Sequence, residues 1–282
     1  MTLLQQRSKD FSADLSKYVS RLKENPTQKG IHRLRTTIRR TETLVNYAGP
    51  KLGKKLEKAL EELQMLRKRA GKVRDLDIQI GLLGAIGNRS ASADRRALLD
   101  ALKKKRARQA ERLKAAVNKL EGSKFLNRLE RITEKASESV PQNGPDPLQV
   151  AQKELAEVAN EFSTTLALKP SRLHDLRIKL KLLRYRAELA EETPEQKELI
   201  ERLRSVQDAI GEWHDWGMLA EGAEKQFGNR VSCALLAEIR SLFTARFSAA
   251  TSAALNLLAT CVPPGKKKPS SVQPSGAFAQ RA

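Results

Sequence analysis

The sequence contains few aromatic residues, cysteines and histidines. Only 4% of its 282 residues are Phe, Trp or Tyr, two are cysteine and three are histidine. The two cysteines, Cys233 and Cys261, have no metal-ligand spacing and cannot form a disulfide framework, which fits a reducing compartment. Long alternating runs of Val, Ile and Thr are also missing, so the composition favours helices over sheet.

The sequence has no long hydrophobic run either. No segment approaches the 18 or so apolar residues that a membrane-spanning helix needs. The first residues, Met1 to Asp10, lack the apolar core of a signal peptide. We therefore expect a soluble, cytoplasmic protein without membrane contacts.

Acidic residues are fewer than basic residues in this sequence. Lys and Arg number 53 and Asp and Glu 33, which gives a formal net charge of +20 and a sequence pI near 10.1. A chain this basic should bind polyanions or anionic surfaces in a salt-dependent way. The charge indicates the class of partner and leaves its identity open.

Hydrophobic residues recur at helical spacing between Pro and Gly residues, and this pattern predicts an all-α fold. Ala, Leu, Lys, Arg and Glu, which dominate the composition, are also good helix formers. The expected helices cover about 3–23, the stretch from after Pro26 to 48, 52 into the 81–87 region, 94–120, 125–137, 148–168, a segment starting after Pro170, a segment starting at Pro194, and 231–258.

A segment with three prolines and a glycine divides the chain almost in half, because these residues cannot continue a helix. We place a first helical bundle at residues 1–140, a linker at 141–147 and a second bundle at 148–262. Residues 263–282 form a basic, low-complexity tail that we expect to be disordered.

A basic motif occurs once in each half. The segments 31–40 and 173–182, 142 residues apart, share the form apolar-His-x-Leu-Arg-x-x-apolar-basic. On a helix, positions i, i+3 and i+7 fall within about 60° of one another, so each copy gathers a basic row on one face. The rows are His32, Arg35 and Arg39 in the first half, and His174, Arg177, Lys181 and Arg184 in the second.

Apolar residues flank the second basic row on both sides. One flank holds Leu173, Leu176, Leu180 and Leu183, and the other holds Ile178, Leu182, Tyr185 and Leu189. This arrangement indicates a helix whose cations face an interior groove rather than open water. Because buried, unpaired cations are energetically costly, such a row needs an anionic partner or a wet cavity.

A second motif is also duplicated, 140 residues apart. Segments 63–75 and 203–215 align, and each has a glycine in mid-helix, Gly71 and Gly211. Such a glycine usually permits the close approach of another backbone, which we expect here. A basic or titratable residue followed by Asp comes three residues later: Arg74-Asp75 in the first copy and His214-Asp215 in the second.

The first motif, His-x-Leu-Arg-x-x-x-Arg-Arg, and the second, Gly-x-Val-Arg-Asp-Leu-Asp, followed by degenerate copies of both, resemble the CHAD family, the conserved histidine α-helical domain. The resemblance covers about residues 5–260. It implies two antiparallel helical bundles, related by an internal pseudo-twofold repeat, around a central basic cavity that binds inorganic polyphosphate. The matching polyphosphate-facing residues are His32, Arg35, Arg39, Arg40, Arg74, His174, Arg177, Lys181, Arg184 and His214.

We predict binding without catalysis, and neither a cofactor nor a metal ion. No histidines or cysteines have the spacing that places metal ligands on one helix face, and neighbouring cations would repel a metal. The sequence shows neither a glycine-rich loop that could bind phosphate nor a group of carboxylates that could hold Mg²⁺. Association with polyphosphate granules would follow from the ligand, while the oligomeric state stays open.

Two other functions stay open. A nucleic-acid-binding protein is favoured by the charge and the basic tail, although few Asn, Gln or aromatic residues lie beside the basic rows. An enzyme of phosphate metabolism is the other. If the histidines contribute to polyphosphate binding, affinity should rise as the pH falls from about 8 to 6.

Individual segments also have simpler interpretations. Each basic row could be an ordinary solvated helix face, and His214 could be a core histidine held by the adjacent carboxylate. The run 103–108, five cations and one alanine, is typical of a solvated face but could extend an anion track. Trp213 and Trp216 are expected to pack in the core or between the bundles.

Overall fold

The computed structural model describes residues 2–24, 26–86, 93–121, 124–140, 144–163, 168–228 and 233–261. Within these ranges the chain forms nine α-helices and no strand, which confirms the all-α prediction. The helices are α1 (Leu3–Glu24), α2 (Gln28–Ala48), α3 (Lys54–Ala85), α4 (Ala93–Glu121), α5 (Phe125–Ser139), α6 (Pro147–Ser163), α7 (Pro170–Ala187), α8 (Pro194–Phe227) and α9 (Ala234–Cys261). The predicted tail, 263–282, and linker residues 141–143 lie outside the described residues.

Caps and prolines set the ends of the helices that carry the motifs. Thr27 caps α2 by accepting a hydrogen bond from the Gly30 amide, and Gly49 ends the helix in the left-handed conformation at φ 59°. Pro170 opens α7 in the first turn, where its missing N–H costs nothing. These residue types are visible in the sequence, and the predicted ends therefore lie close to the observed ones.

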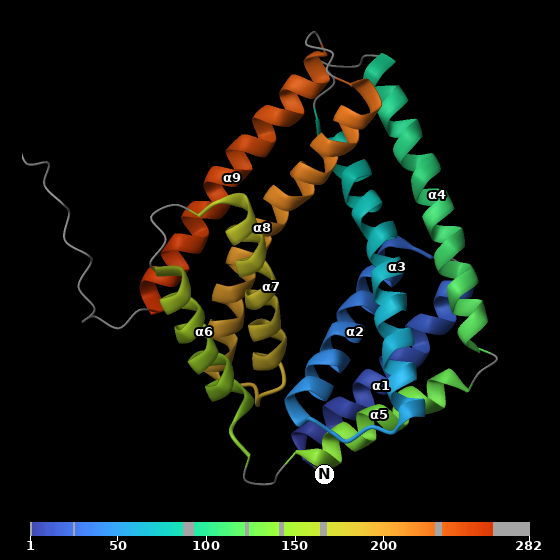
Figure 1. Ribbon diagram of the computed structural model, residues 1–282, viewed down its shortest axis with the longest axis vertical. Helices are drawn as coiled ribbons and strands as arrows, with labels where there is room; N and C mark the ends of the chain where they lie inside the picture. The colour runs from blue at the N-terminus through green and yellow to red at the C-terminus, as the bar shows by residue number, and fades with distance from the viewer. Residues whose placement is uncertain are drawn as a thin grey trace, which may run out of the picture.

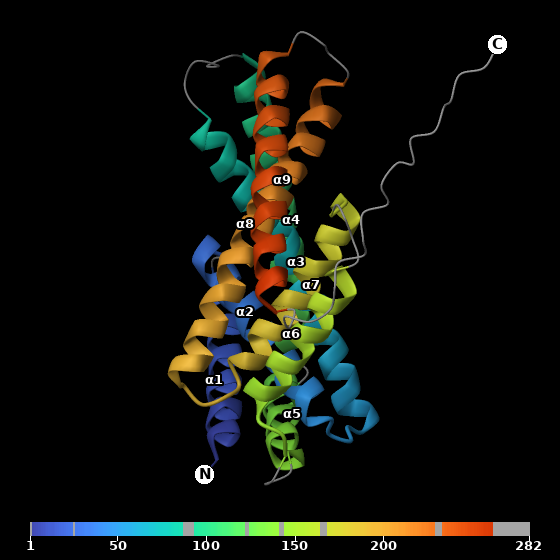
Figure 2. The same cartoon turned by 90° about the vertical axis from the view of Figure 1, so that its left-hand side faces the viewer.

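The helices form two lobes that converge at one end (Figure 1). Helices α1, α2 and α5 and the first part of α3 make one lobe, and α6 and α7 with parts of α8 and α9 make the other (Figures 1 and 2). Across the lobes, α2 contacts α7 and α3 contacts α8. The four helices that carry the duplicated motifs therefore meet at the boundary between the two halves.

Three hydrophobic clusters hold the fold together. One lies almost entirely within the first half and one within the second. The third joins the ends of α3 and α4 to α8 and the start of α9, and includes Leu76, Leu83 and Trp216. Trp213 lies in the second cluster, so both tryptophans pack in the interior as predicted. The proposed division into bundles 1–140 and 148–262 and their pseudo-twofold relation stay predictions.

Candidate functional site

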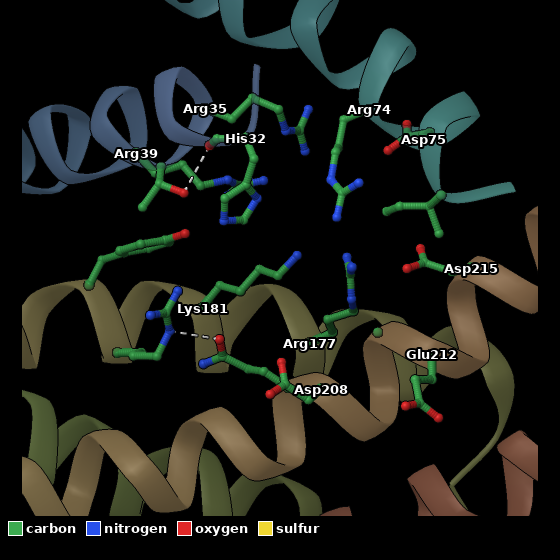
Figure 3. Close-up of a pocket in the computed structure, with 16 residues that line it drawn as sticks. His32, Arg35, Arg39, Arg74, Asp75, Arg177, Lys181, Asp208, Glu212 and Asp215 are labelled. Carbon is green, nitrogen blue, oxygen red and sulfur yellow. Dashed lines mark hydrogen bonds between the residues drawn. The ribbon is translucent and has the colours of Figure 1, made fainter. Parts of the chain in front are cut away.

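A pocket of about 480 Å³ lies between the two halves, lined by α2 and α3 on one side and α7 and α8 on the other (Figure 3). We call it the basic pocket. It brings together seven of the ten residues predicted from the sequence: His32, Arg35, Arg39, Arg74, Arg177, Lys181 and Arg184. Figure 3 shows the α2 and α3 cations directed toward those of α7. The two basic rows therefore face the same space.

Four cations in the basic pocket have no hydrogen-bond or ion-pair partner among the described residues. Among the described residues, none forms a hydrogen bond or an ion pair with the side chains of Arg39, Arg74, Arg177 and Lys181. The Arg177 Nε atom is buried and unsatisfied. Buried polar groups are nearly always hydrogen-bonded in proteins, so such a cluster is the feature of the site that most needs an external partner.

Partly buried cations elsewhere on the same helices are paired. Arg67 Nε lies 2.9 Å from Glu42 Oε1, and Arg40 Nε lies 2.8 Å from Glu188 Oε2.

Within the basic pocket, Arg35 and Arg184 also have partners. Arg35 Nη1 donates to the backbone carbonyl of Arg67 at 3.4 Å, and Arg184 has two side-chain partners. Arg184 donates to Gln207 Oε1 at 2.9 Å and to Glu188 Oε1 at 2.6 Å. Exposed cations elsewhere, such as Lys103 and Lys104, also lack partners among the described residues, so the distinctive property of this pocket is that its unpaired cations are partly buried.

Burial and mutual repulsion lower the pKa values of these cations. Burial lowers the pKa of Lys181 to about 7, with further lowering by Arg177, Arg39 and Arg35 and opposition from Asp215. Burial is also the largest cause of the lowered pKa values of Arg35, Arg39 and Arg177. Partial burial and the charge of Arg74 lower the pKa of His32. The pocket is thus a region where clustered positive charges are only partly compensated by carboxylates such as Asp215.

Four carboxylates also line the basic pocket: Asp75, Asp208, Glu212 and Asp215. Burial raises the pKa of Asp75, Arg35 opposes this shift, and Asp215 adds to it. In Figure 3, Asp75, Asp215 and Glu212 lie toward one end, away from Lys181. Among the described residues, no three His, Cys, Asp or Glu side chains are grouped so that they could hold a metal ion.

The sequence argument did not single out several residues of the lining. Asp208 and Glu212 precede Asp215 by seven and three positions, so helical spacing alone could have placed them on the same face of α8. The other unpredicted lining residues, which include Thr36, Ile78, Tyr185 and Gln207, come from all four helices. Their presence depends on how the halves pack, for which the sequence carries no local signal.

Three residues predicted to face the ligand lie outside the lining. Arg40 Nε donates to Glu188 Oε2 at 2.8 Å and lines a separate pocket of about 380 Å³. The rings of His174 and His214 stack on each other, with centroids 6.0 Å apart. His214 Nδ1 also lies 3.2 Å from Asp215 Oδ1, which matches the alternative of a histidine held by the adjacent carboxylate.

Gly71 approaches a side chain and not another backbone, which corrects the expectation from the sequence. A Cβ atom at this position would lie 2.2 Å from Arg35 Nη1. At Gly211 the nearest atom would be Arg177 Nη2, at an ordinary 3.9 Å. Glycine inside a helix lowers helix stability by about 1 kcal/mol relative to alanine. At position 71 the missing side chain leaves the space that the Arg35 guanidinium group occupies.

The second apolar flank of α7 is only half buried. Tyr185 and Leu189 are buried as expected, but Ile178 and Leu182 are 55% and 40% exposed. The apolar flank is therefore uncovered at Ile178 and Leu182, although the cations Arg177 and Lys181 line the basic pocket. In the run 103–108, the three lysines are exposed and Arg106 pairs with Asp77, so the lysines lie on a solvated face of α4.

The comparisons with known proteins support the family resemblance. The CHAD domain family matches residues 10–223, and the chain belongs to this family. The crystal structure of the CHAD domain from the plant Ricinus communis superposes with a TM-score of 0.65 at 15% identity, covering 94% of this chain and 91% of that one. PptA from Streptomyces chartreusis gives a TM-score of 0.60 at 15% identity, with 92% and 97% covered. These likenesses show the fold.

No curated protein matches the sequence. Among the described helices, none combines the length and the apolar character that crossing a membrane requires.

Proposed function

We propose that this protein binds linear inorganic polyphosphate in the basic pocket and does not turn it over. The observation that carries the proposal is the meeting of four partnerless cations, Arg39 and Arg74 from one half with Arg177 and Lys181 from the other, around one cavity. A chain of phosphate groups supplies closely spaced negative charges, each with oxygens that accept hydrogen bonds from more than one donor.

The binding mechanism is electrostatic. Guanidinium groups engage phosphate oxygens bidentately, and Lys181 acts as a point charge. Burial, reinforced by repulsion from Arg177, Arg39 and Arg35, lowers the pKa of Lys181 to about 7. An entering anion opposes this shift, so binding raises this pKa and takes up a proton near neutral pH. The carboxylates at one end of the basic pocket repel the polymer there and favour its placement over the cationic end.

The lining favours polyphosphate over a nucleic acid. Reading an adenine requires a free amide edge, and holding a single strand requires aromatic platforms. The amide of Gln207, the lining residue with such an edge, is already used, since its Nε2 donates to Leu180 O and its Oε1 accepts from Arg184. Tyr185 is buried. Nucleic acid is therefore a secondary, charge-driven ligand, and polyphosphate granules are the expected cellular location.

The test is a competition between long-chain polyphosphate and DNA at one salt concentration. We expect polyphosphate to displace DNA from the wild type. An Arg35→Ala, Arg177→Ala variant should lose about 100-fold in polyphosphate affinity, because each lost charged hydrogen bond is worth roughly 1.5 kcal/mol. A Lys103→Ala, Lys104→Ala variant removes the same charge from an exposed face of α4 and is the matched control.

Three outcomes would contradict the proposal. The first is equal affinity for DNA and polyphosphate. The second is an equal loss of affinity in the control variant, which would mean that only the net charge matters. The third is release of orthophosphate from polyphosphate in the presence of Mg²⁺, which would make the protein an enzyme.

A further inference from the structure

The mid-helix glycine of α3 lies directly against an arginine of the basic pocket. Gly71 is buried near the middle of α3, and a methyl group there would lie 2.2 Å from Nη1 and 3.4 Å from Cζ of Arg35. Real Cβ contacts essentially never fall below 3.0 Å. The guanidinium group of Arg35 therefore occupies the space that any other residue at position 71 would fill.

This contact fixes the direction of the guanidinium group. Arg35 Nη1 donates to the backbone carbonyl of Arg67, one helical turn before Gly71, at 3.4 Å. Its Nη2 would be 3.9 Å from a Cβ at position 71, so this edge of the group lies further from α3. One edge of the guanidinium group is thus held on the α3 backbone, which leaves the other N–H groups for the pocket that Arg35 lines.

We propose that Gly71 is a positioning residue, which seats the Arg35 guanidinium group on α3 so that its remaining N–H groups meet the anion in the basic pocket. The inference rests on the proposed function for the identity of that anion. The packing of the Arg35 guanidinium group against Gly71 and the Arg67 carbonyl, which we call the seat, is a property of the protein without ligand.

The two halves differ in this respect. Gly211 has the same place in the second motif, but a Cβ there would lie 3.9 Å from Arg177 Nη2, which is ordinary van der Waals contact. The structure therefore assigns a seat to Arg35 alone. Gly211 therefore does not position Arg177 in the way that Gly71 positions Arg35.

A Gly71→Ala variant tests the seat, with Gly81→Ala as the matched control. Both positions lie within α3, but a Cβ at Gly81 would meet nothing within 4 Å. Because alanine is the better helix former, Gly81→Ala should raise the melting temperature by about 2 °C and leave polyphosphate affinity within twofold of the wild type. Gly71→Ala should keep the helical circular dichroism and melting temperature of the wild type but bind about tenfold more weakly.

A double-mutant cycle separates positioning from a general structural effect. If Gly71 acts through Arg35, the tenfold loss disappears when Gly71→Ala is introduced into an Arg35→Ala background. A loss of the same size in both backgrounds would overturn the inference. So would a Gly71→Ala protein that binds polyphosphate as tightly as the wild type.

A measurement without ligand distinguishes failure of the seat from failure of the proposed function. In the free wild type, the seated guanidinium group should give separate, slowly exchanging NMR signals for its Nη protons, and Gly71→Ala should merge them while Gly81→Ala does not. If the wild type shows this but fails to bind polyphosphate, the proposed function is wrong and the seat stands. If Gly71→Ala leaves the signals unchanged, the seat is wrong whatever the ligand.

Discussion

The helices α2 and α7 carry the same motif, yet they present different side chains to the basic pocket. His32 of α2 lines the pocket, whereas the ring of His174 in α7 stacks on His214 outside the lining. Position 40 of α2 holds an arginine paired with Glu188, and the matching position of α7 holds the exposed Leu182. The two copies of the sequence pattern thus share the basic row but differ in the residues around it.

This difference indicates which residues of the motif contribute to the same site. The basic row at i+3 and i+7, Arg35 and Arg39 in α2 and Arg177 and Lys181 in α7, faces the pocket in both halves. The histidine near the start of each copy lines the pocket only in the first half, as His32. We infer that the shared ligand is held mainly by the cations, and that the histidines contribute unequally.

The largest effect should come from removing the partnerless cations of either half. Arg39→Ala with Arg74→Ala, and Arg177→Ala with Lys181→Ala, should each lower polyphosphate affinity by about 100-fold, since each lost charged hydrogen bond is worth roughly 1.5 kcal/mol. Titration calorimetry at constant salt measures both variants against Lys103→Ala, Lys104→Ala. A large loss from one half only would show that the ligand lies on one bundle and not between the two.

The second effect is a dependence on pH that centres on Lys181. With a pKa of about 7 in the free protein, Lys181 is charged below pH 7 and increasingly neutral above it, while a bound anion raises its pKa. Binding above pH 7 therefore takes up a proton, and affinity should fall by up to about tenfold per pH unit between pH 7 and 9. Lys181→Arg should remove this slope, because arginine stays charged. An unchanged slope in that variant would assign the proton to another group.

A smaller effect should separate the two motif histidines. Burial and nearby cations lower the pKa of His32 below its ordinary value, so its charge appears at a lower pH than for a free histidine, and a bound anion favours the protonated form. At pH 6, His32→Ala should lose about threefold in affinity and His174→Ala less than that. The binding assay at pH 6 and 8 compares them, and equal losses would contradict the divergence of the two halves.

The smallest effect concerns the ion pair between the halves. Glu188 accepts hydrogen bonds from Arg40 of α2 and Arg184 of α7, and its side chain is 12% exposed. Glu188→Gln should raise polyphosphate affinity about twofold at low salt by leaving both arginines less neutralised, and should lower the melting temperature. Weaker binding by a folded variant would mean that this carboxylate helps to place Arg184 for the ligand.

Much of the fold could be predicted because its signals are local. The apolar spacing of each helix, and Thr27, Gly49, Pro170 and Thr193 at helix ends, are readable without knowledge of the packing. It was harder to predict which cations line the pocket and which are paired with carboxylates. Arg40 and Glu188 are 148 residues apart, and nothing near either one reveals that they pair.

The errors at the site have similar causes. Periodicity assigned Ile178 to an enclosed flank because it reports which side of a helix is apolar, and not whether another element covers that side. The glycine in mid-helix correctly indicated a close approach at position 71, but the sequence could not reveal that the approaching group is the Arg35 side chain. Both features depend on how α7 and α2 sit against their neighbours.

The most direct test of the central claim is the salt dependence of polyphosphate binding for the wild type, Arg39→Ala, Arg177→Ala and the double variant. If cations of both halves contact one polymer, each single variant should reduce the slope of log K against log salt by about 0.7, and the double variant by about 1.4. Wild-type slopes in either single variant would contradict a ligand shared between α2 and α7.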